Sequence, residues 1–365
     1  MDTGLKNRVI CILFALVFGS GLLFGVFWPK AEYSEQERRK LAQAPQLSAE
    51  AVWSGRFMRA FEAHITDTFP FRDTFRRVNA WAAADMFRRQ DYHGLYLADG
   101  YLAAVEYPFQ EASLNYAVER FRFVCQKYLT EENAVYVSVI PDKNCFLAEE
   151  SGHLCMDYNA LEQQVEAKAD FAEYVSISDL LEKEDYYKTD THWRQEKIID
   201  VAKRLAKRMG AACEEEYTLH TLEQDFYGVY YGQAALPIAP DRLQYLTSEA
   251  IDACRVYDWE NRKEIPVYHM EKAAGADPYE MFLSGSLSLL TIENPDAPKG
   301  KKLILFRDSF GSSIAPLWVS GYSQITLVDI RYIQPEFLGN FVDFKDCDVL
   351  FLYSTLTWNN SETLN

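Results

Sequence analysis

The sequence predicts an α/β fold in which helices cover both faces of a mostly parallel sheet. Uninterrupted apolar, β-rich segments of strand length occur at residues 134–140, 174–177, 302–306, 324–328 and 349–353. Segments with helix-like apolar spacing lie at residues 113–129, 160–169, 194–209 and 311–319. Strands that are buried on both faces have such continuous apolar runs, and their alternation with helices is typical of parallel sheets. With 365 residues, of which 48% are hydrophobic, the chain can bury a large core.

An apolar segment near the N-terminus is long enough to cross a bilayer as a helix. Residues 9–28 carry no charged side chain, Lys6 and Arg8 precede them, and Lys30 follows. A cleaved signal peptide is the alternative, but the segment ends in Gly-Val-Phe-Trp-Pro, a poor cleavage site, which favours an uncleaved anchor. A long domain that follows a first helix is commonly translocated. We therefore expect a single-pass protein of the cell membrane with its large domain outside the cytoplasm.

Three parts are expected along the chain. Residues 1–30 form a cytoplasmic tail and transmembrane anchor, residues 31–90 a helical stalk, and residues 91–365 the α/β domain. Residues 214–300 interrupt the alternation of strands and helices and are expected to be an insertion in that domain.

Within the stalk, the segment Ser34-Glu-Gln-Glu37 matches a capping box and predicts a short helix that ends before Pro45. Helical spacing follows at residues 48–69 and 73–87. At the start of the α/β domain, the dipeptide Asp99-Gly100 between two short apolar runs predicts a hairpin.

Composition excludes some classes of function. The chain has 54 acidic and 37 basic residues, for a formal net charge of −17, so it would repel phosphate backbones and is not expected to bind nucleic acid. The charge suits a neutral glycan, or an anionic one held at local basic positions. The seven cysteines show no C-x-x-C or zinc-binding pattern. We expect no metal and no cofactor. Whether the six cysteines beyond the apolar segment form disulfides is left open.

Two short motifs carry the residue types of nucleophilic catalysis. One is Asp190-Thr-His192-Trp193, directly before a predicted helix, and the other is Asp-Ser309-Phe-Gly, directly after the apolar strand at 302–306. Ligands bind at the carboxyl ends of strands in an open parallel sheet. A serine at such a turn lies near backbone N–H groups, a histidine supplies the base that it needs, and a carboxylate orients the histidine. The motifs therefore predict Asp190, His192 and Ser309 as one catalytic set.

Simpler interpretations exist for the same residues. Ser309 and Asp190 could each be the N-cap of the helix that follows them. Trp193 is expected in the core or in the wall of the site, and Asn144, which follows a buried strand together with Lys143, is a candidate for the site's lining. Arg307 and Asp308 could pair with each other or shape the site, but an exposed position is the favoured expectation for both.

The two motifs, in this order and separation, resemble those of the DHHW family. Those bacterial envelope proteins are similar to the periplasmic alginate O-acetyltransferases, which belong to the SGNH hydrolase-like group. Further segments that resemble the family occur in order at residues 35–38, 67–73, 141–144 and 226–228. The resemblance implies an SGNH-like sheet in which Ser309 is the nucleophile, His192 its general base and later acid, and Asp190 the residue that orients His192. The backbone N–H of Ser309 would donate to the oxyanion.

The resemblance also implies a function. It points to an O-acetyltransferase or esterase that acts on a cell-envelope polysaccharide, with a multispanning membrane O-acyltransferase as the donor partner. One position departs from the family: its Gly-Gly-Asn pattern is replaced here by Ser284-Gly285-Ser286. Ser286, Asn144 or a backbone N–H could replace the missing oxyanion donor. Otherwise the protein is slow or inactive and serves as a glycan-binding or assembly partner of a membrane-bound acyltransferase.

Overall fold

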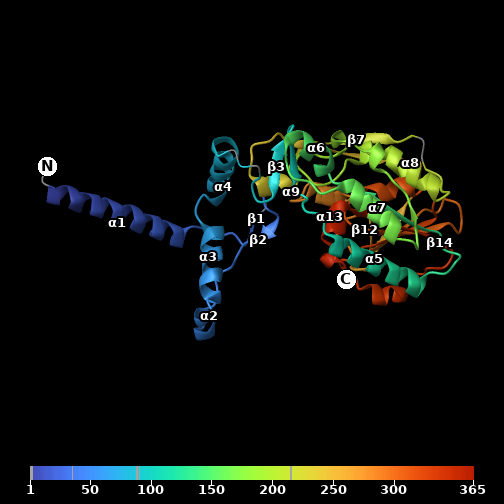
Figure 1. Cartoon of the computed structure of the whole chain (residues 1–365), viewed down its shortest axis with the longest axis horizontal. Helices are drawn as coiled ribbons and strands as arrows, with labels where there is room; N and C mark the ends of the chain where they lie inside the picture. The colour runs from blue at the N-terminus through green and yellow to red at the C-terminus, as the bar shows by residue number, and fades with distance from the viewer. Residues whose placement is uncertain (1–2, 35, 88, 90, 214–215) are drawn as a thin grey trace. The chain divides into compact units, whose positions relative to one another are not determined.

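The computed structural model describes residues 3–34, 36–87, 89, 91–213 and 216–365. The chain divides into two compact units. The first, which we call the N-terminal unit, comprises Met1–Arg89 with Ala235–Pro237. The second, the sheet unit, comprises Gln90–Ala234 and Ile238–Asn365. Each is described by itself, with its elements labelled as in Figure 1.

The N-terminal unit begins with a single long helix, α1 (Thr3–Phe27). Within it, the window Gly4–Gly21 is long and apolar enough to cross a membrane by length and composition. Three shorter helices follow: α2 (Ala49–Trp53), α3 (Arg56–Thr68) and α4 (Arg72–Trp81), the last continued by a π-helical turn at Ala82–Met86. Gly55, with a φ of +72°, separates α2 from α3, where the sequence had indicated one continuous helix.

The short helix predicted at Ser34 is wrong. Tyr33–Ser34 (β1) and Arg39–Lys40 (β2) instead pair as an antiparallel hairpin. Ser34 Oγ does accept a hydrogen bond from the N–H of Glu37, at 3.2 Å, as a capping serine would. The Glu37 carboxylate, however, forms ion pairs with Arg72 and Arg76, so a tertiary contact takes the group that the capping box requires.

The sheet unit is built on eight strands in the order β10-β9-β11-β13-β12-β14-β5-β6. The pairs among β13, β12, β14, β5 and β6 are parallel, whereas β11, β9 and β10 add antiparallel strands at one side. The bounds are β5 (Val135–Ile140), β6 (Glu173–Tyr174), β9 (Arg255–Asp258), β10 (Lys263–Ile265), β11 (Leu289–Glu293), β12 (Lys302–Arg307), β13 (Gln324–Val328) and β14 (Cys347–Ser354).

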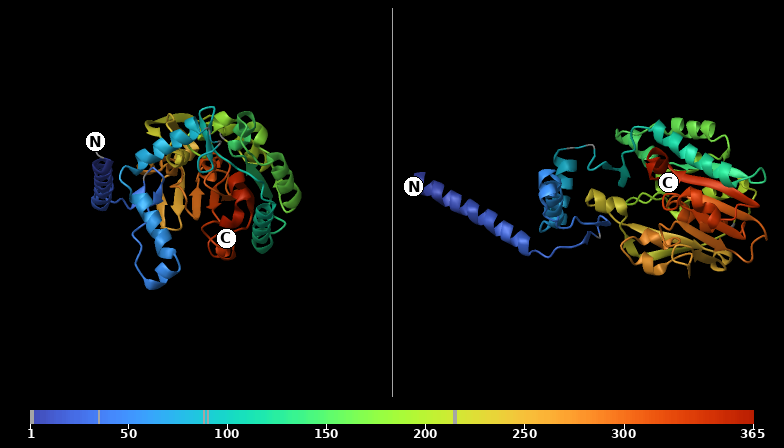
Figure 2. Two further views of the ribbon diagram at one scale, coloured as in Figure 1. Left: turned by 60° about the vertical axis from the view of Figure 1, so that its left-hand side comes forward. Right: turned by 90° about the horizontal axis from the view of Figure 1, so that it is seen from below.

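Helices cover both faces of this sheet, and the predicted fold class is confirmed (Figure 2). One face packs on α5 (Glu111–Tyr128), α7 (Tyr158–Lys168) and α13 (Thr355–Asn359), and the other on α8 (Ile199–Arg208), α12 (Gly311–Ile314) and the 3₁₀ turn Ala315–Trp318. The remaining helices are α6 (Asn144–Ser151), α9 (Val229–Ala234), α10 (Glu249–Asp252) and α11 (Met270–Ala273), with 3₁₀ turns at Ser178–Leu180, Lys183–Asp185, Gln195–Lys197, Pro278–Met281, Pro335–Asn340 and Ser361–Thr363.

Two hairpins lie outside the main sheet. In the first, β3 (Leu95–Ala98) and β4 (Tyr101–Ala104) pair across Asp99 and Gly100, whose φ values of +47° and +78° are those that a two-residue hairpin turn needs. In the second, β7 (Thr218–Phe226) pairs with β8 (Asp241–Thr247). The segment at 214–300 therefore supplies this second hairpin as well as three strands of the main sheet. All seven cysteines are free thiols.

Candidate active site

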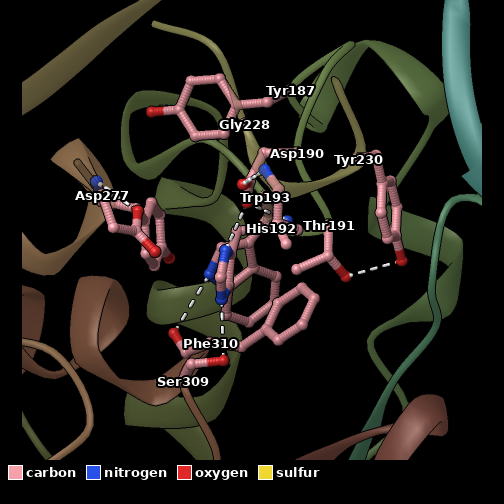
Figure 3. A network of polar contacts seen from close by, with 12 residues as sticks. Tyr187, Asp190, Thr191, His192, Trp193, Gly228, Tyr230, Asp277, Ser309 and Phe310 are labelled. Atoms are coloured by element: carbon pink, nitrogen blue, oxygen red, sulfur yellow. Dashed lines mark hydrogen bonds and ion pairs between the residues drawn. The ribbon is translucent and has the colours of Figure 1, made fainter. Parts of the chain in front are cut away.

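Asp190, His192 and Ser309 meet at the C-terminal end of β12 (Figure 3). His192 Nε2 lies 2.7 Å from Ser309 Oγ, and His192 Nδ1 lies 2.5 Å from Asp190 Oδ1. With the ring proton on Nδ1 facing the carboxylate, Nε2 is free to accept the hydrogen bond of the serine hydroxyl. Asp190 is 1% exposed and His192 9%, so the pair is shielded from water. This is the geometry of an activated serine nucleophile.

The Asp190 carboxylate is fixed by backbone donors. Its Oδ1 also accepts the N–H of His192 at 3.1 Å, and its Oδ2 accepts the N–H of Val229 at 2.8 Å. Val229 comes so close because residue 228 is glycine. A Cβ at Gly228 would lie 2.3 Å from the Cβ of Asp190. The Phe-Tyr-Gly228 segment therefore holds the carboxylate in the orientation that His192 needs.

The loop that carries Asp190 is anchored from two sides. The Asp241 carboxylate accepts from the N–H of Lys188 at 2.9 Å, from the N–H of Thr189 at 2.7 Å and from the Thr189 hydroxyl at 2.6 Å. Lys143 Nζ donates to the carbonyl oxygens of Tyr187 and Asp190, both at 2.6 Å, and to that of Lys188 at 3.3 Å. Burial lowers the pKa of Lys143 to about 7, against the attraction of nearby carboxylates that raises it.

Ser309 is held by the residue before it. Asp308 Oδ1 accepts the N–H of Phe310 at 3.1 Å. Its Oδ2 accepts the N–H of Ser354 at 2.8 Å, the Ser354 hydroxyl at 2.7 Å and the Thr357 hydroxyl at 3.0 Å. One carboxylate thus ties the turn after β12 to the end of the neighbouring strand β14 and the start of α13.

The capping interpretations do not hold. The helix after Ser309 begins at Gly311 with Phe310 as its N-cap, and the turn after Trp193 has Arg194 as its N-cap. Both Ser309 and Asp190 direct their side chains to His192 instead.

The expectation that Arg307 and Asp308 are exposed is wrong. Arg307 is 0% and Asp308 2% exposed. The Arg307 guanidinium lies 3.7 Å from the Asp329 carboxylate and donates to the carbonyl of Leu287 at 3.3 Å. A Cβ at Gly311 would lie 2.5 Å from the Cβ of Arg307, so this glycine allows the turn to pack on the arginine. Charged residues are expected at the surface when only the sequence is known. Arg307 and Asp308 are buried because each has charged or hydrogen-bonding partners.

Two aromatic side chains shape the histidine's surroundings. The Tyr279 ring stacks on the His192 ring, with centroids 3.8 Å apart and planes 9° from parallel. The Tyr279 hydroxyl donates to Ser313 Oγ at 2.9 Å, and Trp193 Nε1 donates to the same oxygen at 2.9 Å. Trp193 is fully buried and packs edge-on against Phe310. Sequence reasoning missed Tyr279, for which the only signal is its position in the segment that ends at Ser286.

The candidate oxyanion residues differ in their surroundings. Ser286 is exposed, and the carbonyl of Gly285 faces Arg307 at 3.5 Å. Asn144 is buried, where its Oδ1 accepts from the Tyr96 hydroxyl at 2.7 Å and its Nδ2 donates to the Tyr158 hydroxyl at 3.1 Å. Among the described residues, neither Ser286 nor Asn144 makes a hydrogen bond to Ser309. Nor do the described residues include a group of three or more His, Cys, Asp or Glu that could hold a metal ion.

Comparisons by sequence and by structure give different results. No protein-family model and no curated protein sequence matches the chain. Among solved structures, a DHHW family protein from Eubacterium siraeum matches with a TM-score of 0.59 at 19% identity, over 75% of this chain and 95% of that one. Bacillus cereus PatB1 with a sulfonyl adduct matches with a TM-score of 0.55 at 16% identity, over 73% of this chain and 96% of that one.

The O-acetyltransferase domain of Pseudomonas putida AlgJ is more distant, with a TM-score of 0.40 at 13% identity over 73% of this chain and 92% of that domain. The two better matches each share more than nine tenths of their length with this chain at low identity. The chain therefore has the fold of a DHHW family protein and of PatB1, in agreement with the resemblance of its sequence motifs.

Proposed function

We propose that the protein is a membrane-anchored acyltransferase or esterase that carries an acyl group on Ser309. The observation that carries this proposal is the unbroken chain of short contacts from Asp190 through His192 to Ser309, at 2.5 and 2.7 Å. A serine hydroxyl is a weak nucleophile unless a base removes its proton, and a histidine can do so only when its other nitrogen is held in the correct tautomer.

The reaction follows from these positions. As Ser309 Oγ attacks the acyl carbonyl carbon, its proton passes to His192 Nε2 and Asp190 stabilises the imidazolium. The backbone N–H of Ser309 donates to the oxyanion of the tetrahedral intermediate. His192 then gives the proton to the leaving oxygen, and the acyl-serine forms as the bond to that oxygen breaks. A hydroxyl of the acceptor, or water, then loses its proton to His192 and attacks the acyl carbon. The bond from that carbon to Ser309 Oγ breaks as His192 gives the proton to Oγ, which releases the ester or the acid and regenerates Ser309.

For the substrate, we propose acetyl transfer to a polysaccharide of the cell envelope, outside the cytoplasm. The apolar helix α1 supports a membrane anchor, and the acidic composition of the chain suits a neutral glycan better than a polyanion. A multispanning membrane O-acyltransferase is the proposed source of the acyl group. The choice between transfer and hydrolysis depends on whether the acceptor excludes water from the acyl-serine.

One observation favours a second function, that of a glycan-binding or assembly partner with little catalysis. Ser286 stands at the place of the family's asparagine, and its hydroxyl is a weaker donor for the oxyanion than the side-chain amide that it replaces. Loss of a side-chain oxyanion donor typically costs about 10²–10³ in rate. A low turnover would then accompany an intact nucleophile.

The test uses the full chain in detergent, a fluorophosphonate or sulfonyl fluoride probe, and an aryl acetate. Covalent labelling and acetate release are both expected, and Ser309→Ala should abolish labelling and lower turnover by about 10³-fold or more. The exposed pair of Ser151 and His153, whose Oγ and Nδ1 lie 2.8 Å apart, offers a matched control without a role in the site. Ser151→Ala should leave labelling and turnover unchanged.

The two proposed functions separate in the same assay. A folded wild-type chain that neither reacts with the probe nor turns over would refute the acyl-serine mechanism and favour the binding function. Labelling of Ser309 together with a slow burst of acetate would support the mechanism and identify acceptor supply as the missing component. Adding an oligosaccharide acceptor then distinguishes transfer from hydrolysis, because only a transferase yields the acetylated sugar.

A further inference from the structure

The helices of the N-terminal unit expose a large amount of apolar surface. Met58, Phe61 and Ile65 form a stripe along α3, at helical spacing, and Phe75 and Val78 form another along α4. The two stripes meet where Phe69 contacts Phe75, with ring centroids 5.6 Å apart. We call these residues, together with the exposed Trp53 and Trp81, the apolar face: Trp53, Met58, Phe61, Ile65, Phe69, Phe75, Val78 and Trp81.

Such a face is unusual on a surface in water. Trp53 is 94% exposed and Phe75 57%, and a concentration of large exposed apolar side chains on neighbouring helices marks a site of association with a protein or a lipid surface. The same helices carry arginines: Arg59 and Arg77 are exposed, whereas Arg72 is paired with Glu37 and Asp67. Large apolar side chains together with arginines on the same amphipathic helices are typical of helices that lie in a membrane interface.

The apolar face adjoins the candidate membrane span. A cavity of about 440 Å³ is lined by Val17, Phe18 and Gly21 of α1 and by Ile65 and Phe69 of α3. Gly21 is the last residue of the window that can cross a membrane. The apolar segment continues to Trp28, so if α1 crosses a bilayer, Ile65 and Phe69 lie beside the C-terminal half of the span itself.

An aromatic contact also joins the residue that follows α1 to the turn between α3 and α4. Trp28, just after α1, packs on Phe71, the residue before α4, with centroids 4.9 Å apart. The turn between α3 and α4 is thus in contact, through Phe71, with the residue that follows α1.

The net charge of the chain differs between the part next to the candidate span and the rest. Residues 29–89, which follow the apolar segment, contain 11 basic and 8 acidic side chains, a net charge of +3, whereas residues 90–365 contain 24 basic and 45 acidic ones, a net charge of −21. An anionic bilayer attracts the first part and repels the second. Among the possible occupants of the apolar face, this charge favours a lipid surface.

We propose that α2, α3 and α4 lie on the membrane that α1 crosses, with the apolar face among the lipid acyl chains and headgroups of an anionic bilayer. The helices act as an interfacial platform, so that the chain has a second membrane contact beside its anchor. The inference rests on α1 as a membrane span and is independent of the Ser309 reaction.

The experiment measures which tryptophans reach the lipid. The full chain is reconstituted, one copy per nanodisc, in phosphatidylcholine and phosphatidylglycerol whose acyl chains are brominated, and quenching of tryptophan fluorescence is recorded. Trp53→Phe and Trp81→Phe should together remove most of the quenching that remains beyond that of Trp28. The matched control is Trp259→Phe in the sheet unit, a side chain that is also exposed, at 41%, and that should contribute no quenching.

Each other outcome counts against the proposal. If aqueous iodide quenches Trp53 and Trp81 and brominated lipid does not, the apolar face lies in water and the proposal is overturned. If Trp53 and Trp81 are shielded from both quenchers only when each nanodisc holds two copies, the apolar face binds a second chain. If Trp259 is quenched by brominated lipid as strongly as Trp53 and Trp81, the lipid contact is not specific to the apolar face. Phe61→Glu with Phe75→Glu, checked for helix content by circular dichroism, should reduce the lipid quenching, and no reduction in a folded variant would also overturn the proposal.

Discussion

Lys143 Nζ donates a hydrogen bond to the backbone carbonyl of Asp190 at 2.6 Å, so a buried amine holds the residue that orients His192. The lysine is 1% exposed and lies at the end of β5, where α6 begins. It gives the loop at 187–190 a rigid connection to the sheet. The Asp190 carboxylate faces the histidine, while the Asp190 backbone is held by the lysine.

Lys143→Met should therefore lower turnover more than it perturbs the fold elsewhere. The carbonyls of Tyr187 and Asp190 would lose their donor, which costs about 1–3 kcal/mol each when no water replaces it. A shift of Asp190 by about 1 Å is expected to lower kcat about 10²-fold. Aryl acetate kinetics checks this, with Lys188→Met as control, because Lys188 lies in the same loop with an exposed side chain. Equal effects of the two substitutions would contradict the role given to Lys143.

The same lysine predicts how stability depends on pH. Its pKa falls from 10.5 to about 7 on burial, so between about pH 7 and pH 10.5 the unfolded chain binds more protons than the native one. The contribution of Lys143 to the free energy of unfolding therefore rises with pH across that window and is flat below it, where both states are protonated. Urea unfolding of the full chain in detergent, at about pH 7 and about pH 9, should show a rise in the wild type that is smaller in Lys143→Met. Identical pH slopes would mean that burial does not depress this pKa.

Gly228→Ala should disturb the position of the Asp190 carboxylate. The added Cβ would lie 2.3 Å from the Cβ of Asp190, so either the carboxylate or the chain at Val229 must move. We expect a loss of about 1–3 kcal/mol in stability and a fall in kcat with little change in KM. Val229→Ala is the control, because it keeps the backbone N–H that Asp190 accepts. If the Gly228 variant kept wild-type kcat, the close approach would not matter for catalysis.

Two substitutions of Tyr279 separate the effect of its ring, which stacks on His192, from that of its hydroxyl, which bonds to Ser313. Tyr279→Phe keeps the ring over His192 and loses only the hydroxyl bond to Ser313, so stability should fall by about 1 kcal/mol with kcat nearly unchanged. Tyr279→Leu removes the ring, which leaves His192 less restrained, and should lower kcat about 10-fold or more. Thermal unfolding and the pH profile of kcat together check both variants. The contrary result, a phenylalanine variant as slow as the leucine one, would transfer the role from the ring to the hydroxyl.

Sequence reasoning was sufficient where the physical signal is local. The apolar runs at β5, β12 and β14 specify buried parallel strands, because few other structures bury so many consecutive apolar residues. The Asp99-Gly100 turn follows from the conformational freedom of its two residues. Asp190, His192 and Ser309 were found because their residue types, at the ends of predicted elements, have a chemical reason to occur together.

The features that the sequence did not predict depend on contacts between residues that are distant in sequence. The burial of Arg307 has its cause in Asp329 and in the carbonyl of Leu287, neither of which is near in sequence. The stacking of Tyr279 on His192 joins two elements with no common pattern. The predicted helix at Ser34 failed because Glu37 is taken by arginines of α4. A single sequence does not reveal these partners, because each is chosen by the tertiary fold.

The position of β14 also determines how the sheet unit can assemble. β14 lies inside the sheet, between β12 and β5, although no later strand follows it among the described residues. Val135 of β5 pairs with Val349 of β14, so the first and last parallel strands of the unit meet side by side. Until β14 is available, β5 has an open edge toward the centre and Asp308 lacks the donors of Ser354 and Thr357. Such non-local pairing slows folding. The turn at Ser309 can therefore reach its final geometry only after the last strand has paired, and until then the unpaired edge of β5 is open to association with other chains.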